Sequence, residues 1–126
     1  MKIVTTVESV AFTTEYDKFF RKYSEKHFGS SFDWRWFKAQ GIAESMLDPD
    51  AESWCGAKGI MQIMPGTFKD IKREINSWIK SVDDPEQNIA AGIYYDRKLG
   101  ILHLGLKVVY TFRKPEFGQS YSVGNN

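Results

Sequence analysis

A glutamate close to the end of a helical stretch is the residue best placed for chemistry in this sequence. Phe37, Gly41 and Glu44 are spaced i, i+4, i+7, which puts them on one face of a helix. Burial of an unpaired carboxylate and the dipole at a helix C-terminus both raise a carboxyl pKa. A carboxylic acid that is still protonated near neutral pH can act as a general acid. The competing interpretation is that Glu44 faces solvent at a frayed helix end.

The segment downstream of this glutamate has the composition of a binding loop. Ser53 carries a small hydroxyl, and residues 56–67 read GAKGIMQIMPGT. Glycine, as at Gly59, lets a backbone approach a ligand closely, and the Gln62 amide both donates and accepts hydrogen bonds. Met64 is a further candidate for ligand contact, although methionines more often fill gaps in a core.

A second carboxylate for acid–base chemistry would have to come from the acidic residues beside this loop. Asp48, Asp50 and Glu52 lie in a turn-rich stretch that begins at an Asp-Pro pair. That composition favours a solvated loop over a catalytic role for any of the three.

Amphipathic helices must position these residues. The apolar stripes predict four helices, over residues 12–28, 32–47, 65–79 and 85–104. Ser31 or Asp33 is the expected cap of the second helix, which should end before Pro49. The fourth helix has the clearest start, because Asp84 is followed by proline and then by Gln87 three residues after the cap.

Composition excludes several classes of function. The 126 residues suit one domain, and a net charge of +1 gives no electrostatic case for nucleic-acid binding. One cysteine and two separated histidines exclude a disulfide framework and a zinc cluster, so we expect no metal and no cofactor. No apolar run approaches the roughly 20 residues that span a bilayer, so we expect no membrane insertion. We expect a monomer.

Four motifs occur in order: Glu44-Ser45, a serine nine residues after the glutamate, GAKGIMQIMPGT, and NIAAGIYY at 88–95. Together they resemble the soluble-type lytic transglycosylase domain of the lysozyme-like superfamily over residues 32–100. The family pattern is ES, a downstream serine, G-x-x-G-x-M-Q-x-M-P-x-T and N-x-x-x-G-x-x-Y. The combination is specific, whereas ES or MQ alone would carry no information.

The resemblance implies a mostly α, α+β lysozyme-like fold with a catalytic cleft. Residues 1–126 would then be a single domain, with 1–30 as an N-terminal helix, 31–105 as the catalytic core and 106–126 as a divergent tail. Its substrate would be the peptidoglycan glycan strand. Glu44 would protonate the oxygen between MurNAc and GlcNAc and then act as a base, closing a 1,6-anhydroMurNAc ring without water, in a substrate-assisted reaction.

The resemblance also implies substrate-binding roles. Ser53 would hold the N-acetyl group, and Gly59, Gln62 and Met64 would line the cleft. Either Tyr94 or Tyr95 matches the family's tyrosine near the acid, and the sequence does not settle which.

The C-terminal part departs from the family pattern. The family continues into an A-Y-N-A-G element, for which the best counterpart here is VVYTFRKP, with Tyr110 in place of the tyrosine. The three residues after Tyr110 do not match, so the resemblance does not supply this wall of the cleft.

Two alternatives stay open at this point. One is a goose-type muramidase that uses water on the same fold, and the other is a glycan-binding protein whose divergent C-terminus has weakened its activity. In each case the site of action is the cell wall, in the periplasm or outside the cell. The first residues show no signal-peptide pattern, so we expect delivery by a phage or a chain trimmed of its leader.

Overall fold

The computed structural model describes residues 12–75 and 78–100. The helices within these two ranges are α2 (Asp17–Phe28), α3 (Arg35–Ser45), α4 (Pro65–Ile75) and α5 (Pro85–Leu99). The mostly helical class expected from the sequence is confirmed. In the described part, β pairing is limited to two isolated bridges, from Glu52 to Lys58 and from Lys58 to Ile63. None of the helices within 12–75 and 78–100 is both long and apolar enough to cross a membrane.

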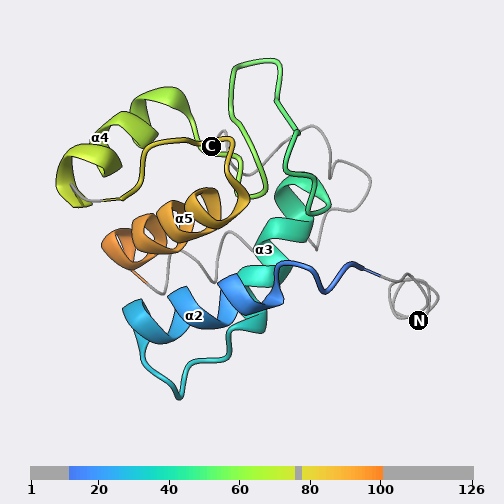
Figure 1. The fold of residues 1–126 in the computed structure, drawn as a ribbon, viewed down its shortest axis with the longest axis vertical. Helices are drawn as coiled ribbons and strands as arrows, with labels where there is room; N and C mark the ends of the chain where they lie inside the picture. Colours follow the sequence, from blue (N-terminus) through green and yellow to red (C-terminus); the bar gives the residue numbers. More distant parts are fainter. Residues whose placement is uncertain (1–11, 76–77, 101–126) are drawn as a thin grey trace.

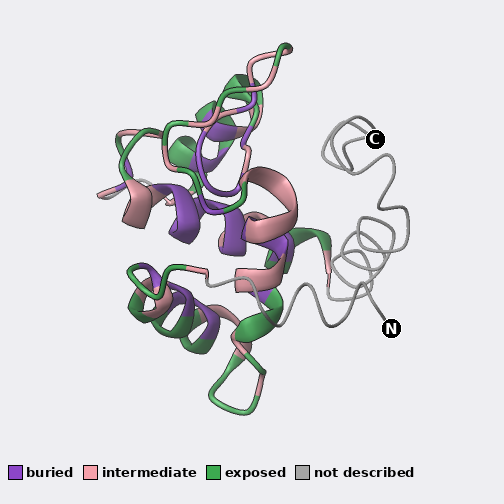
Figure 2. Ribbon diagram, turned by 90° about the vertical axis from the view of Figure 1, so that its right-hand side faces the viewer, coloured by how far each residue is buried: buried purple, intermediate pink, exposed green. Residues whose placement is uncertain are grey.

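The helices pack around α5. This helix contacts α2 on one side and α4 on the other, and α3 packs against α2. Figure 1 shows this order, with the loop that follows α3 projecting away from the helices. The buried residues face the inside of this arrangement (Figure 2). The fully buried apolar side chains that form the centre of the core are Phe20, Phe37, Ile60, Ile71, Ile89 and Ile93.

Helix α2 ends where the sequence predicted, at Phe28. Gly29 follows with φ 91°, a left-handed backbone that glycine adopts without steric cost. The helix begins only at Asp17, so Phe12 and Tyr16 precede it, although Tyr16 is still buried in the core. A half-buried ion pair of 2.8 Å joins Lys38 on α3 to Asp17.

Helix α3 is shorter at both ends than the predicted 32–47. It begins at Arg35, and the Asp33 carboxylate accepts the Arg35 N–H at 3.0 Å. Trp34 occupies the cap position and makes no side-chain cap, so neither Ser31 nor Asp33 is the cap residue. It ends at Ser45 because Met46 and Leu47 take left-handed φ angles of 58° and 62°. The Leu47 N–H then reaches back to the Gly41 carbonyl at 3.4 Å, and its buried side chain packs where a Cβ of Gly41 would be.

Helices α4 and α5 begin as predicted. Pro65 opens α4, and the Asp84 carboxylate caps α5 by accepting the Gln87 N–H at 2.9 Å. α4 ends at Ile75, so the predicted extension to residue 79 is wrong. Ile79 is buried in the core although it is not part of a helix. α5 ends at Leu99 and Gly100 follows with φ 102°, so the predicted unbroken helix from 85 to 104 is wrong. Residues 101–104 and the predicted tail 106–126 lie outside the described residues. The predicted division into an N-terminal helix, a core and a tail stays a prediction.

Candidate active site

Glu44 lies in the last turn of α3 and is half-buried. Gln40, one turn earlier and therefore on the same side of the helix, lines a cavity. Phe37 and Gly41, which share this face of the helix with Glu44, are buried against the core. Glu44 is not itself a lining residue of the cavity, but it lies one helical turn from Gln40, which is, and its side chain is partly covered.

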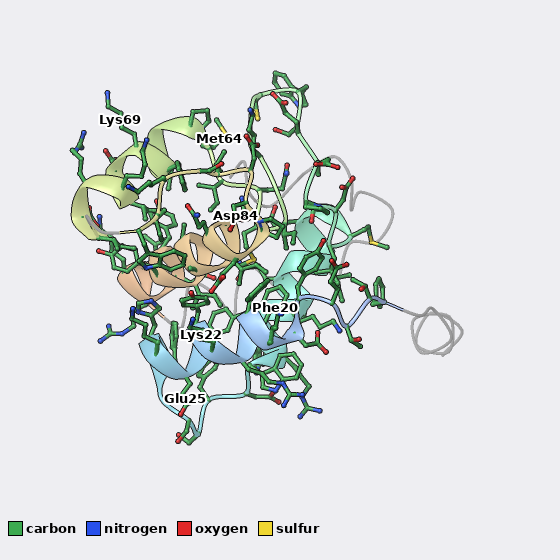
Figure 3. All side chains as sticks on the ribbon, viewed as in Figure 1. Phe20, Lys22, Glu25, Met64, Lys69 and Asp84 are labelled. Carbon is green, nitrogen blue, oxygen red and sulfur yellow. The ribbon has the colours of Figure 1, made fainter. Side chains whose placement is uncertain are left out.

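The cavity has a volume of about 120 Å³ and lies between α3, α5 and the segment that leads into α4. Its lining residues are Gln40, Met61, Gln62, Ile63, Met64, Thr67, Gly92, Tyr95 and Asp96. Three of the residues predicted as substrate-binding, Gln62, Met64 and Tyr95, are thus brought together. Figure 3 shows Met64 where the loop meets the start of α4, and 37% of its surface is exposed.

The two neighbouring tyrosines of α5 have different surroundings. Tyr95 lines the cavity. The Tyr94 hydroxyl donates to the Glu74 carboxylate at 2.7 Å, and its ring lies edge-on to His27 with centroids 5.8 Å apart. The hydrogen bond to Glu74 also raises the pKa of Tyr94. Tyr94 is therefore directed to α4 and α2, and Tyr95 is the tyrosine at the cavity.

Gln62 uses part of its hydrogen-bonding capacity inside its own loop. Its backbone has a left-handed φ of 50°, and its amide nitrogen donates to the carbonyls of Ala51 at 3.2 Å and Gly59 at 3.0 Å. What this side chain can offer a ligand in the cavity is its amide oxygen, which is a hydrogen-bond acceptor.

Ser53 and Gly59 do not line the cavity but shape the loop beside it. The Ser53 hydroxyl accepts the Ala57 N–H at 3.0 Å and lies 3.3 Å from the sulfur of Cys55. Gly59 has φ 80°, and its N–H donates to the Ala51 carbonyl at 2.8 Å. Any side chain at position 59 would collide with Asn88, since a Cβ would be 2.2 Å from its amide nitrogen.

The loop that carries the acidic residues is solvent-exposed and turn-rich, as the sequence predicted. Asp48, Asp50 and Glu52 are exposed, and the Asp48 carboxylate accepts the Asp50 N–H at 2.8 Å, as a turn-forming aspartate does. Within the described ranges no group of histidine, cysteine and carboxylate side chains could hold a metal ion. Tyr110, the remaining predicted binding residue, lies outside the described residues.

Sequence reasoning missed two polar residues at the floor of the cavity. Gln40 and Asp96 are 3% and 1% exposed, and the Gln40 amide nitrogen donates to the Asp96 carboxylate at 3.4 Å, joining α3 to α5. Their positions carried a signal: Gln40 precedes Glu44 by four residues, and Asp96 follows Gly92 by four on the buried face of α5. Neither residue belongs to the motifs that drew attention first.

Known proteins with similar sequences share this part of the chain. Membrane-bound lytic murein transglycosylase F of Photobacterium profundum is 34% identical over 84 residues, which are 67% of this chain and 14% of that protein. The protein of the same name from Haemophilus influenzae is 39% identical over 71 residues, 56% of this chain and 13% of that protein. The chain thus spans about one seventh of the length of these relatives.

Solved structures show the same fold. The 70 kDa soluble lytic transglycosylase of Escherichia coli superposes with a TM-score of 0.57 at 30% identity, over 71% of this chain and 15% of that chain. An inactive mutant of lytic transglycosylase Slt from Pseudomonas aeruginosa gives a TM-score of 0.65 over 86% of this chain and 17% of that chain. At 23% identity this second likeness concerns the fold alone.

The family assignment rests on the sequence from α2 to the end of α5. The transglycosylase SLT domain matches residues 23–100, which include Glu44, the loop 56–64 and every residue that lines the cavity. Since the match covers more than half of the chain, this protein belongs to the transglycosylase SLT domain family.

Proposed function

We propose that this chain is the catalytic part of a peptidoglycan lytic transglycosylase, which cleaves the MurNAc-β-1,4-GlcNAc bond and leaves 1,6-anhydroMurNAc ends. Membership of the SLT domain family supports the reaction class. The observation that carries the proposal is the place of Glu44, half-buried in the last turn of α3, on the side of the helix where Gln40 lines a cavity. A positioned proton donor is what cleavage of a glycosidic bond requires.

In this proposal Glu44 carries out both proton transfers. It first donates a proton to the glycosidic oxygen, and the substrate's own acetamido group stabilises the sugar cation that forms. The Glu44 carboxylate then takes the proton from the C6 hydroxyl of MurNAc, whose oxygen bonds to C1 and closes the anhydro ring. One carboxyl group is sufficient, because the acetamido group replaces the second carboxylate of the usual scheme.

The other carboxylates near Glu44 do not favour the hydrolytic alternative. Asp48, Asp50 and Glu52 are exposed on the loop after α3. Asp96 lines the cavity, but it is 1% exposed and receives a hydrogen bond from Gln40, so its oxygens are not open to a sugar ring. A muramidase that activates water with a second carboxylate therefore has weaker support than the transglycosylase.

We further propose that the predicted binding residues divide into two groups. Gln62, Met64 and Tyr95 would contact the glycan strand from the cavity side. The Ser53 hydroxyl would donate to the acetamido carbonyl, giving up at most its contact with the Cys55 sulfur, which is a weak hydrogen-bonding partner. Gly59 would act through the absence of a side chain, since its N–H is bonded within the loop. Tyr110 remains a candidate for the opposite wall.

Glycan strands as substrate would place the action of this protein at the cell wall, as a monomer in the periplasm or outside the cell. Lysis of bacteria exposed to the purified protein from outside would show that it is bacteriolytic, as an endolysin is.

The test is release of soluble fragments from purified peptidoglycan by matched variants. Glu44→Gln removes the acid and keeps the size of the side chain, and we expect release to fall by at least about 100-fold, the lower end of general-acid contributions. Glu52→Gln, a nearby exposed carboxylate, is the control and should keep wild-type release. Equal loss in the two variants, or none in Glu44→Gln, would exclude Glu44 as the catalytic acid.

A further inference from the structure

One peptide group of the loop is bonded to two helices at once. The carbonyl of Ile60 accepts the Ser45 hydroxyl of α3 at 2.8 Å, and the N–H of Met61 donates to the Asn88 side-chain oxygen of α5 at 2.8 Å. The carbonyl and the N–H belong to the same peptide unit, which is planar. A rotation of this peptide unit therefore disturbs both hydrogen bonds. We name this arrangement, Ser45 to the 60–61 peptide to Asn88, the peptide bridge.

The α5 end of the peptide bridge is held rigidly. Asn88 is 1% exposed, and its amide nitrogen donates to the carbonyls of Lys58 at 3.0 Å and Val82 at 2.9 Å. With its oxygen on Met61, the side chain uses both donors and its acceptor, a set that only asparagine and glutamine carry. One turn along α5, Gly92 leaves the space in which the Met61 side chain packs, since a Cβ there would be 2.8 Å from it.

The α3 end lies directly beside the candidate acid. Ser45 follows Glu44 in the chain, and its hydroxyl also lies 3.2 Å from the Gly41 carbonyl and accepts the Asp48 N–H at 3.2 Å. On the other side of the bridge, Met61 precedes Gln62, which lines the cavity. The peptide bridge thus joins the backbone next to the acid to the backbone next to the cavity wall.

We propose that Ser45 and Asn88 are positioning residues, which set the distance between Glu44 and the cavity wall through the 60–61 peptide. The inference rests on the proposed function, because it assigns Glu44 the proton transfers. Neither residue touches substrate. A shift of about 1 Å in a catalytic group can cost on the order of 100-fold in rate, so loss of the bridge should lower kcat more than it changes KM.

Ser45→Ala is the main variant, with two companions. It removes the hydroxyl and leaves the Ile60 carbonyl without that donor, and we expect kcat on solubilised glycan strands to fall by about tenfold or more, with KM within about twofold. Ser45→Thr keeps a hydroxyl that can make the same bond in a helix, and it should restore most of kcat. Ser24→Ala is the matched control, because Ser24 is a serine of α2, 1% exposed, whose hydroxyl has no hydrogen-bond partner among the described residues.

A second measurement tests the hydrogen bonds of the peptide bridge without an enzymatic reaction. Amide hydrogen exchange at Met61 should accelerate in Ser45→Ala, while amides of α2 keep their wild-type rates, because a loosened peptide opens more often. Exchange can also be followed in Asn88→Asp, which keeps the acceptor for Met61 but loses both donors of the amide nitrogen. If that variant does not fold, the Ser45 series still decides.

The outcomes separate the two proposals. Lower kcat with faster Met61 exchange in Ser45→Ala, and recovery in Ser45→Thr, supports the positioning role. If Ser45→Ala has an unchanged kcat per folded molecule and only a lower Tm, Ser45 has a structural role alone and the inference is overturned. A wild-type protein that releases nothing from peptidoglycan overturns the proposed function. In that case Met61 exchange alone decides whether Ser45 holds the peptide.

Discussion

Backbone strain is concentrated at the residues around the proposed site. Among the described residues, the non-glycine positions with positive φ are Met46, Leu47 and Gln62. Two of them follow Glu44 within three residues, and the third lines the cavity. Left-handed backbone costs an ordinary residue about 1–2 kcal/mol, so the surrounding contacts must hold these conformations in place. Strain of this kind is common at active sites.

The two tyrosines of α5 provide a matched pair at the residue scale. Tyr95→Phe removes a hydroxyl from the cavity lining, and we expect kcat/KM for glycan strands to fall by about fivefold, which corresponds to one hydrogen bond of about 1 kcal/mol. Tyr94→Phe removes only the bond to Glu74, so its activity should equal that of wild type. Steady-state kinetics on both variants checks this, and the reverse order would place the wrong tyrosine at the cavity.

At the scale of one residue, the sequence predicted which residues belong to the candidate site better than it predicted where their side chains point. Glu44, Gln62 and Met64 were named from motifs, and the structure brings the last two to one cavity. Tyr94 and Tyr95 could not be separated, because residues that are adjacent in a helix point about 100° apart and only the packing of α4 and α2 decides which one faces inward. The bonds of Asn88 were not predictable, because its partners are backbone groups of distant loops.

At the element scale, the starts of α4 and α5 and the end of α2 were predictable, whereas the starts of α2 and α3 and the ends of α3 and α4 were not. The start of α5 depends on Asp84 and the proline after it, a local signal. The end of α3 coincides with the burial of Leu47, whose side chain packs into the core beside Gly41. The backbone at Leu47 is left-handed and therefore no longer helical. That contact lies outside any local pattern, so the sequence placed the end two residues too late.

This helix end gives a paired prediction. Met46 and Leu47 have nearly the same left-handed φ, but Met46 is 63% exposed and Leu47 only 4%. Met46→Gly relieves backbone strain and loses little burial, so we expect stability to rise by about 1 kcal/mol. Leu47→Gly loses a buried side chain and should lower stability by about 2 kcal/mol or more.

Urea unfolding of both variants at one pH measures the two changes. A loss of stability in Met46→Gly would mean that its side chain contributes packing which the exposure of Met46 does not show.

At the scale of the whole molecule, the contact between α2 and α5 includes a titratable group. His27 of α2 lies edge-on to Tyr94 of α5, and the Arg97 side chain donates to the His27 carbonyl at 2.8 Å. Burial lowers the pKa of His27 below its ordinary 6.5, with smaller contributions from Lys26 and Arg97. The folded state therefore favours the neutral imidazole more than the unfolded chain does.

The sign of the pH dependence follows from that direction. Below pH 6.5 the unfolded chain binds a proton at His27 before the folded chain does, so stability falls as the pH drops through this window. We expect Tm to fall from pH 7.5 to pH 5.5, and His27→Phe, which keeps a ring against Tyr94, to show a smaller fall. Thermal unfolding of both proteins at several pH values checks this. Parallel curves would mean that His27 contributes nothing to the pH dependence.

The central claim for the whole molecule is the chemistry that one acid performs at the cavity. The most direct measurement is the mass of the fragments released from purified glycan strands. The account predicts fragments with 1,6-anhydroMurNAc ends, each lighter by one water than the hydrolysis product, and their absence from digests with Glu44→Gln. Fragments with reducing MurNAc ends would contradict it and identify a muramidase on the same fold.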